Sequence, residues 1–435
     1  MIENDRIYVD YIVLQKQKYK KLIKFNKHNL CVNIGRDTIN LSGIEGCFFS
    51  SVFKLYSSSG KKNREYQLEL TDEVVNLKDE IDIRSSGIDN RNIIDDGMSQ
   101  KLTTAEIEDL KVDSNKASDI VESLIVNSNT FHNKTEYAQE KYLRKKEKKY
   151  FEYIQILRPN LRIIAEVMYK LDPIKIQGIR LDTLSQIMTL ANIHSEGNHL
   201  LYDSGSNGLL AAALLSAIGQ NTNGKLVHIH PGNMSQKQAL LAMNFQSEHY
   251  NRCVSVNVYS ALRQYYQGND TNAKSHHVQN PLKRRAEEKI DSKAKVAKTN
   301  NEDDNINITS ETLQTNDTNT NMEPKKPKWF FDNVASSLIL KDKMDSLVIA
   351  CREDPKNIFM ELVEFVKPGR PFVIYYCVVE PLQQLYSTLK SQSNIAALKL
   401  TCNWMRHYQV LPERTHPEVM MNGASGFLLS GYVIS

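Results

Sequence analysis

Residues 200–208, LLYDSGSNG, decide the fold of the larger part of this chain. The apolar run ends at Asp203, glycines follow at Gly205 and Gly208, and residues 209–218, LLAAALLSAI, make an Ala/Leu-rich helix candidate. A doubly wound sheet binds nucleoside cofactors at such a succession of strand, acidic residue, glycines and helix. The stretch therefore predicts the first strand and helix of a Rossmann-like domain.

Apolar runs and helical periodicity alternate on both sides of this stretch. Strands are predicted at residues 226–229, 345–350 and 371–376, and helices at 182–190, 236–245, 358–366 and 382–391. Residues 426–434 close the chain as a last strand or hairpin. Alternating strands and helices indicate βαβ units with right-handed crossovers, and hence a parallel sheet.

The preceding residues have a different pattern. Short runs of alternating apolar and polar residues fill the first 75 positions, with turn residues between them, which is typical of a small antiparallel, barrel-like β domain. We therefore predict an α/β protein with a β domain at 1–86, a helical linker at 87–150 and a Rossmann-like domain at 151–435. Residues 266–328 contain almost no aliphatic side chains, and we expect them to be a disordered insertion.

Composition excludes several classes of protein. The 55 Lys and Arg residues against 51 Asp and Glu give a net charge of only +4, so total charge does not indicate a nucleic-acid binder. The six cysteines form no CxxC pair, which favours free thiols in a reducing compartment over a metal site or disulfides. No apolar run is long enough to cross a membrane, and we expect no membrane partner.

The distribution of charge is more informative than its sum. Within the helix predicted at 134–150, six basic residues fall in nine positions: Lys141, Arg144, Lys145, Lys146, Lys148 and Lys149. Like charges three and four residues apart repel each other on a helix, and a phosphate backbone would offset that repulsion. A solvated surface helix is the alternative interpretation.

The glycine loop departs from a working cofactor site in two ways. A strict acidic-x-Gly-x-Gly-x-Gly pattern needs glycines at positions 207 and 209, where this chain has Asn207 and Leu209. We expect the branched side chain of Leu209 to occupy the place of a ligand. The next predicted strand ends at His228 and His230, without the carboxylate that would bind ribose hydroxyls. Together these departures argue against cofactor binding.

A third position at the same edge of the sheet is Arg352, which follows the strand predicted at 345–350. Its guanidinium would repel a sulfonium cofactor, whereas it suits a phosphate or a base edge. An ion pair with Glu353 or Asp354 is equally consistent with the sequence.

Several further motifs stand out: residues 89–97 (DNRNIIDDG), 99–103 (SQKLT), 141–146 (KYLRKK), 180–184 (RLDTL), 369–373 (GRPFV) and 404–417 (WMRHYQVLPERTHP). They resemble the non-catalytic subunit family of the eukaryotic tRNA (adenine-N1) methyltransferase, which implies that the domain at 151–435 is of the methyltransferase type. The resemblance covers about residues 87–265 and 329–435. It implies a heterotetramer with two catalytic subunits, which bind S-adenosylmethionine and modify the T-loop adenosine at tRNA position 58 in the nucleus.

The resemblance also implies that this chain binds tRNA and no cofactor. We expect the basic helix, Arg352, Arg406 and Arg414 to contact the RNA, and the apolar residues of 404–417 and 426–435 to reach a subunit interface. The basic clusters at 283–285 and 325–328 permit a nuclear localisation signal. The alternatives are an active methyltransferase with an atypical glycine loop and a general RNA-binding adaptor.

Overall fold

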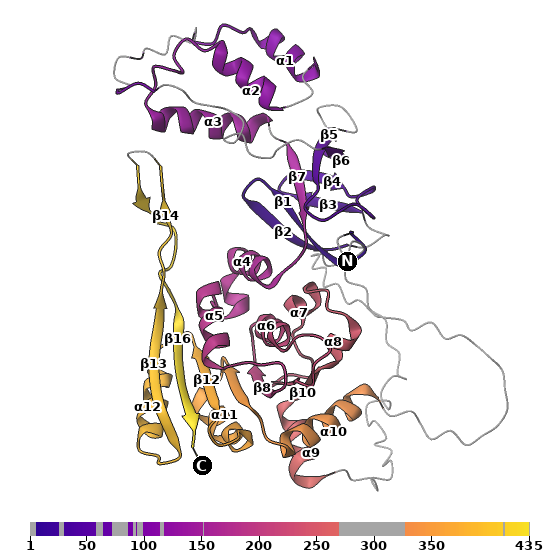
Figure 1. The fold of residues 1–435 in the computed structure, drawn as a ribbon, viewed down its shortest axis with the longest axis vertical. Coiled ribbons are helices and arrows are strands. Elements are labelled where there is room, and N and C mark those ends of the chain that lie inside the picture. The colour runs from indigo at the N-terminus through magenta and orange to yellow at the C-terminus, as the bar shows by residue number, and fades with distance from the viewer. Residues whose placement is uncertain are drawn as a thin grey trace, which may run out of the picture.

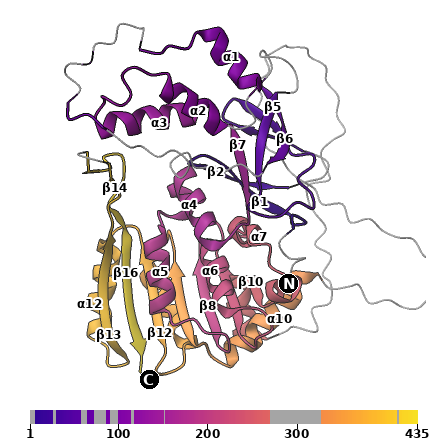
Figure 2. The ribbon, with the colours of Figure 1, turned by 45° about the horizontal axis from the view of Figure 1, so that its top comes forward.

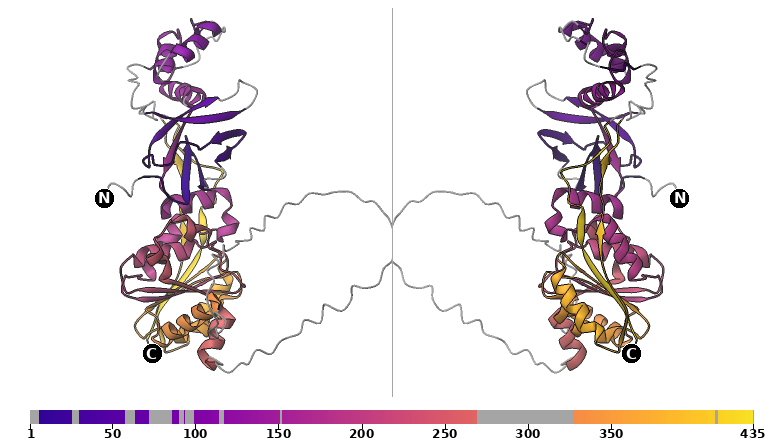
Figure 3. Two further views of the ribbon diagram at one scale, coloured as in Figure 1. Left: turned by 90° about the vertical axis from the view of Figure 1, so that its right-hand side faces the viewer. Right: turned by 90° about the vertical axis from the view of Figure 1, so that its left-hand side faces the viewer.

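The computed structural model describes residues 6–25, 30–57, 64–71, 86–89, 93, 99–113, 117–150, 152–268, 327–411 and 414–434. Three helices lie at one end of an elongated molecule, a small β-sheet domain lies in the middle, and a large sheet with its helices forms the other end (Figures 1 and 3). The predicted insertion and its basic clusters lie outside the described residues, except for residues 266–268 and 327–328.

The large sheet has seven strands in the order β10-β9-β8-β11-β12-β16-β13. The first five are parallel, and β16 runs antiparallel to both of its neighbours. Their bounds are β8 Asn198–Asp203, β9 Lys225–His230, β10 Cys253–Asn257, β11 Ser346–Ala350, β12 Pro371–Tyr376, β13 Ile395–Trp404 and β16 Ala424–Val433. Five parallel strands in this order are the doubly wound arrangement that the sequence predicts.

Helices cover both faces of this sheet, as the edge-on views show (Figure 3). One hydrophobic cluster joins the sheet to α4 Leu161–Leu171, α5 Leu181–Leu190, α6 Leu209–Ile218 and α7 Gln238–Ala242. A second cluster joins it to α9 Val258–Gln267, α10 Lys328–Lys341, α11 Pro355–Leu362 and α12 Glu380–Lys390. Shorter helices are η3 Pro173–Ile176, α8 Ser247–Asn251 and η5 Val363–Phe365. Because the central strands are buried on both faces, they read as continuous apolar runs.

The two antiparallel strands extend beyond the sheet as an arm. We define the arm as described residues 405–423, which include β14 Tyr408–Gln409 and β15 His416–Pro417 between the ends of β13 and β16. It projects away from the large sheet toward the three helices (Figures 1 and 2). The strand β16 is predicted from the sequence but β13 is missed, although residues 398–404 (LKLTCNW) alternate apolar and polar residues as a strand does.

The N-terminal sheet also has seven strands, in the order β2-β1-β7-β5-β6-β4-β3. They are β1 Tyr11–Lys16, β2 Tyr19–Lys24, β3 Cys31–Ile34, β4 Asp37–Asn40, β5 Val52–Ser57, β6 Glu65–Thr71 and β7 Tyr153–Leu157. The edge strands approach each other, since Lys21 Nζ on β2 donates to the Asn33 carbonyl on β3 at 2.6 Å. The sheet is thus nearly closed, as predicted, although β4 and β6 are parallel and not antiparallel.

The position of β7 differs from the predicted domain boundary. The boundary at residue 151 assigns this strand to the methyltransferase-type domain, whereas β7 pairs with β1 and β5 in the N-terminal sheet. The helices α1 Thr104–Asp113, α2 Ala117–Val126 and α3 Glu136–Tyr150 therefore lie between two strands of one sheet in the sequence. No helix in the described part of the chain is long and apolar enough to span a bilayer.

Candidate nucleic-acid interface

The carboxylate of Asp203, at the end of β8, is engaged within its own loop. It is buried and accepts hydrogen bonds from the backbone N–H groups of Gly205 and Ser206, at 3.0 and 2.7 Å. The Ser206 hydroxyl donates to the second carboxylate oxygen of Asp203. Asp203 therefore shapes the turn between β8 and α6.

The open side of the glycine loop is covered by side chains of the same protein. A Cβ atom built on Gly205 would lie 2.5 Å from Nε of Arg352 and 2.8 Å from Nε2 of Gln177. The Gln177 side chain is buried, and neither of its polar atoms has a hydrogen-bond partner among the described residues. A ligand approaching Gly205 would have to displace both side chains.

The two residues after Ser206 act as turn residues. Asn207 and Gly208 have φ values of 57° and 78°. The Asn207 backbone N–H donates to Oε1 of Gln236 at 3.1 Å, and its side-chain amide donates to Oε1 of Gln238 at 2.6 Å. The loop is thereby tied to the start of α7.

Leu209 does not occupy the ligand side of the loop, contrary to the expectation from the sequence. Its side chain is fully buried in the core cluster beneath α6. As the first residue of α6, it packs inward with Leu210 and the neighbouring alanines. The obstruction at the loop therefore comes from Arg352 and Gln177. Gln177 follows η3 in the left-handed conformation, 26 residues before Asp203, and no motif of the sequence indicates the contact.

The end of β9 carries buried histidines in the place of a ribose-binding carboxylate. Burial lowers the pKa of His228 to about 4, and it also lowers the pKa of His230. Both rings are therefore neutral near pH 7. Nε2 of His228 and Nδ1 of His230 have no hydrogen-bond partner in the part of the chain that the structure describes.

Arg352 forms no ion pair with Glu353 or Asp354, although all three residues are described. Its backbone N–H donates to Oγ of Ser204 at 2.8 Å and to Glu353 at 3.1 Å, while Asp354 caps the start of α11. The side chain is exposed and reaches the Ile174 carbonyl at 3.5 Å. The ion-pair alternative is therefore wrong. The guanidinium lies over the glycine loop and has N–H donors beyond the one that contacts the Ile174 carbonyl.

The basic helix α3 packs through its other face. Leu143 and Gln139 are buried, and Leu143 joins a small core with α2 and Phe131. The basic residues on the outward face differ in whether a neighbouring side chain engages them. Arg144 pairs with Glu140 at 3.2 Å, and Lys146 lies over the rings of Tyr142 and Tyr150, so burial lowers its pKa.

Three lysines of α3 remain exposed without an ion pair in the described part of the chain: Lys141, Lys145 and Lys148. Their spacing of four and three residues places them on one face of the helix. Lys149 is exposed next to them, over the ring of Tyr150. This face is a compact array of cations.

The tip of the arm reaches the same helix. The guanidinium of Arg414 lies 5.6 Å from the centre of the Tyr137 ring, in the first turn of α3. Arg406 is half-buried nearer the base of the arm. The structure thus brings Arg414 to the basic helix, whereas it places Arg352 at the glycine loop.

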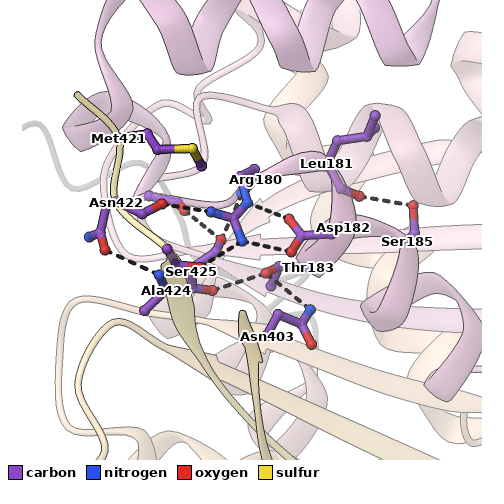
Figure 4. Close-up of polar contacts among 12 residues, drawn as sticks. Arg180, Leu181, Asp182, Thr183, Ser185, Asn403, Met421, Asn422, Ala424 and Ser425 are labelled. Carbon is purple, nitrogen blue, oxygen red and sulfur yellow. Dashed lines mark hydrogen bonds and ion pairs between the residues drawn. The ribbon is translucent and has the colours of Figure 1, made fainter. Parts of the chain in front are cut away.

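The base of the arm is held by Arg180 (Figure 4). Its guanidinium pairs with Asp182 at 2.7 and 2.8 Å, and it donates to the carbonyls of Asn422 and Gly423 at 2.9 and 3.1 Å. Ser425 accepts from the Arg180 backbone N–H at 3.0 Å. The RLDTL motif therefore fixes the direction in which the arm leaves the sheet.

The sequence of this chain is similar to one family model and to curated proteins. The sequence model of the Gcd10p family matches residues 7–319. The mouse protein "tRNA (adenine(58)-N(1))-methyltransferase non-catalytic subunit TRM6" is 30% identical over 456 residues, covering 98% of this chain and 88% of its own length. A Dictyostelium discoideum protein of the same description is 29% identical, covering 92% and 74%.

Among solved structures, the tRNA (m1A58) methyltransferase TrmI from Aquifex aeolicus aligns with a TM-score of 0.43 at 10% identity, covering 98% of this chain and 97% of its own. Family membership rests on the sequence matches, which extend over most of the chain. On these matches, the chain belongs to the Gcd10p family.

Proposed function

We propose that this chain is the non-catalytic, tRNA-binding subunit of a tRNA (adenine(58)-N1)-methyltransferase. The observation that carries the proposal is the covered glycine loop, where Arg352 and Gln177 lie against Gly205. Curated relatives that are described as non-catalytic subunits of that enzyme support it.

The residues around this loop do not fit S-adenosylmethionine. The Arg352 guanidinium lies against Gly205 of the glycine loop, where it would repel a positively charged sulfonium cofactor, and the end of β9 offers a buried neutral His230 where a ribose would need a carboxylate. We therefore propose that this chain holds no cofactor and that a catalytic partner subunit binds S-adenosylmethionine. We propose a heterotetramer with two subunits of each kind, which works in the nucleus.

The RNA-binding part of the proposal rests on charge and position. Three lysines of α3 lack ion pairs among the described residues, and the arm brings Arg414 to the same helix. A cluster of cations without counter-charges suits a phosphate backbone, which binds by releasing counterions. Arg352 and Arg406 belong to the same proposed RNA-binding set.

The proposal is tested by measuring methyl transfer to a tRNA transcript in three samples: the chain alone, the catalytic subunit alone and the two together. Only the combined sample should act on adenosine 58. Binding of radiolabelled S-adenosylmethionine to the isolated chain gives a second readout, and we expect none. Methylation by a preparation that mass spectrometry shows to be free of the partner would refute the proposal.

A further inference from the structure

A lysine-lined cleft separates the N-terminal sheet from the large domain. It lies between the β1–β2 hairpin and the helices α4 and η3, and its volume is about 330 Å³. The strand β2 and the helix α4 are neighbours in Figures 1 and 2. Five lysines line it, three from the hairpin and two from the helical side: Lys18, Lys20, Lys21, Lys170 and Lys175. Asp172 is the single acidic residue among the described residues of its wall.

Several of these charges are already engaged. Lys20 pairs with Glu166 at 3.3 Å, Lys175 lies 3.7 Å from Asp172, and Lys21 donates to the Asn33 carbonyl. Lys18 and Lys170 are exposed and form no ion pair with any described residue. Two cations from different domains, Lys18 and Lys170, thus line one space without an ion-pair partner among the described residues.

The walls of the cleft are fixed in place. The side-chain amide of Asn244 forms two hydrogen bonds with the backbone of Tyr11, at 3.1 and 2.8 Å, and so joins the large domain to β1. The cleft is also lined by Asn207 and Gln238, the hydrogen-bonded pair that ties the glycine loop to α7. The cations are therefore held apart at a preformed site.

One aromatic residue lines the same space. Tyr19 is half exposed at the turn of the hairpin, directly after Lys18. Unpaired nucleotides are bound by aromatic rings that stack on the base and by cations that contact the phosphates. The cleft is at the small end of the range for ligand sites, which suits a single nucleotide and excludes a double helix.

We infer that this cleft binds the sugar-phosphate backbone of an unpaired tRNA nucleotide, with phosphates at Lys18 and Lys170 and a base or ribose against Tyr19. The inference rests on the proposed tRNA-binding function and adds a second contact region, distinct from α3. It connects the N-terminal sheet to RNA recognition through residues that belong to no motif of the sequence.

The test uses the full chain assembled with its catalytic subunit and two different tRNA transcripts. The double variant Lys18→Ala, Lys170→Ala should weaken the binding of both tRNAs to a similar extent. The slope of log Kd against log salt should fall by about 1.4, because each lost contact to single-stranded RNA removes ~0.7. The matched control is Lys225→Ala, Lys341→Ala, which removes two exposed lysines at the amino end of the large sheet.

Tyr19 gives a second readout. Tyr19→Phe should keep the wild-type affinity, whereas Tyr19→Ala should weaken it, since only the ring is needed for stacking. Hydrogen exchange of the intact complex should also slow at residues 16–22 and 167–176 when tRNA is added. The Lys18 and Lys170 variant would overturn the inference if it kept the Kd and salt slope of the control while the wild type binds tRNA. Failure of the wild type to bind any tRNA would instead overturn the proposed function.

Discussion

Gly426 and Gly205 both lack space for a side chain, but their neighbours differ in freedom. A Cβ on Gly426, where φ is +67°, would lie 2.5 Å from the ring of Tyr375, which is buried and donates to the Gln177 carbonyl at 2.7 Å. The three atoms nearest to a Cβ on Gly205 belong to the outer parts of the flexible Arg352 and Gln177 side chains. Small side-chain movements can therefore relieve the clash of an alanine at position 205 but not the clash of an alanine at position 426.

We expect Gly426→Ala to lower the free energy of unfolding by about 2–5 kcal/mol, from backbone strain and overpacking together. Gly205→Ala should cost roughly 1 kcal/mol or less, because flexible side chains can give way. Urea denaturation followed by tryptophan fluorescence measures both. Equal losses for the two variants would contradict the interpretation of the glycine loop.

Two buried histidines predict how stability depends on pH. Burial lowers the pKa of both His199 and His228 to about 4. Because the unfolded chain titrates near pH 6.5, it takes up these protons first as the pH falls. The stabilisation is fully present above about pH 6.5 and is lost between there and about pH 4, by ~1.4 kcal/mol per pH unit for each histidine.

Thermal unfolding measured from about pH 7 down to about pH 4.5 checks this slope. The variant His228→Asn should show a shallower decline than the wild type, since one of the two titrating groups is gone. Carboxylates such as Asp345, whose pKa is lowered from 3.8 by its bonds with Lys367 despite partial burial, lose their stabilisation only at lower pH. A stability that stays constant over this interval would show that the rings are protonated without cost.

At the scale of the element, α3 and the arm carry the proposed RNA surface. Replacing Lys141, Lys145 and Lys148 by Ala should reduce the salt slope of tRNA binding by about 2–3, at ~0.7–0.9 for each phosphate contact. The control replaces Lys225, Lys341 and Lys343, which are exposed near the amino end of the large sheet. An unchanged slope together with an unchanged Kd would mean that α3 is a solvated surface helix.

The direction of the arm depends on the Arg180 network. Arg180→Met would leave Asp182 without its cation and the carbonyls of Asn422 and Gly423 without donors. We expect a loss of about 2–4 kcal/mol in stability, together with faster hydrogen exchange across residues 403–426. Arg162→Met is the matched control, since its pair with Glu166 is exposed and worth ~1 kcal/mol at most. Unaltered exchange in the arm would exclude this anchoring role.

Elements with a strong internal pattern are those that the sequence predicts well. The strand, turn and helix around Asp203 follow from an apolar run, glycines and an Ala/Leu-rich stretch. The contact of Gln177 with the glycine loop escapes prediction because it depends on a partner that is distant in the chain. Local patterns carry no information about such contacts.

On the scale of the whole molecule, exposed apolar side chains concentrate on the arm and its root. Trp404, Val410 and Met420 are 70%, 74% and 97% exposed. The closing strand β16, which the sequence also suggests for an interface, lies between β12 and β13 with Leu428 and Leu429 buried. The arm is therefore the part of the two predicted segments that offers an uncovered apolar surface.

The double variant Val410→Ser, Met420→Ser should weaken association with the catalytic subunit at least about tenfold, since buried side chains of this size are worth ~1.5–3 kcal/mol each. The melting temperature of the isolated chain should not change, because both side chains are already exposed. Phe331→Ser, Leu338→Ser on α10 is the control. Light scattering at micromolar concentration distinguishes the complex from the separate subunits. Equal association of both variants would exclude the arm from the subunit interface.

The place of β7 also has a consequence for synthesis. Within the described sheet, this strand joins the β1–β2 hairpin to the four strands β5, β6, β4 and β3. On the ribosome, the chain must grow from residue 71 to residue 157 before the two halves can pair, which takes about 4–17 s at ~5–20 residues per second. During that interval the nascent chain presents two open strand edges, each a template for pairing with another chain. We therefore expect a fragment ending at residue 150 to aggregate and one ending at residue 158 to remain dispersed, so that chaperones act on this protein before its larger domain has been made.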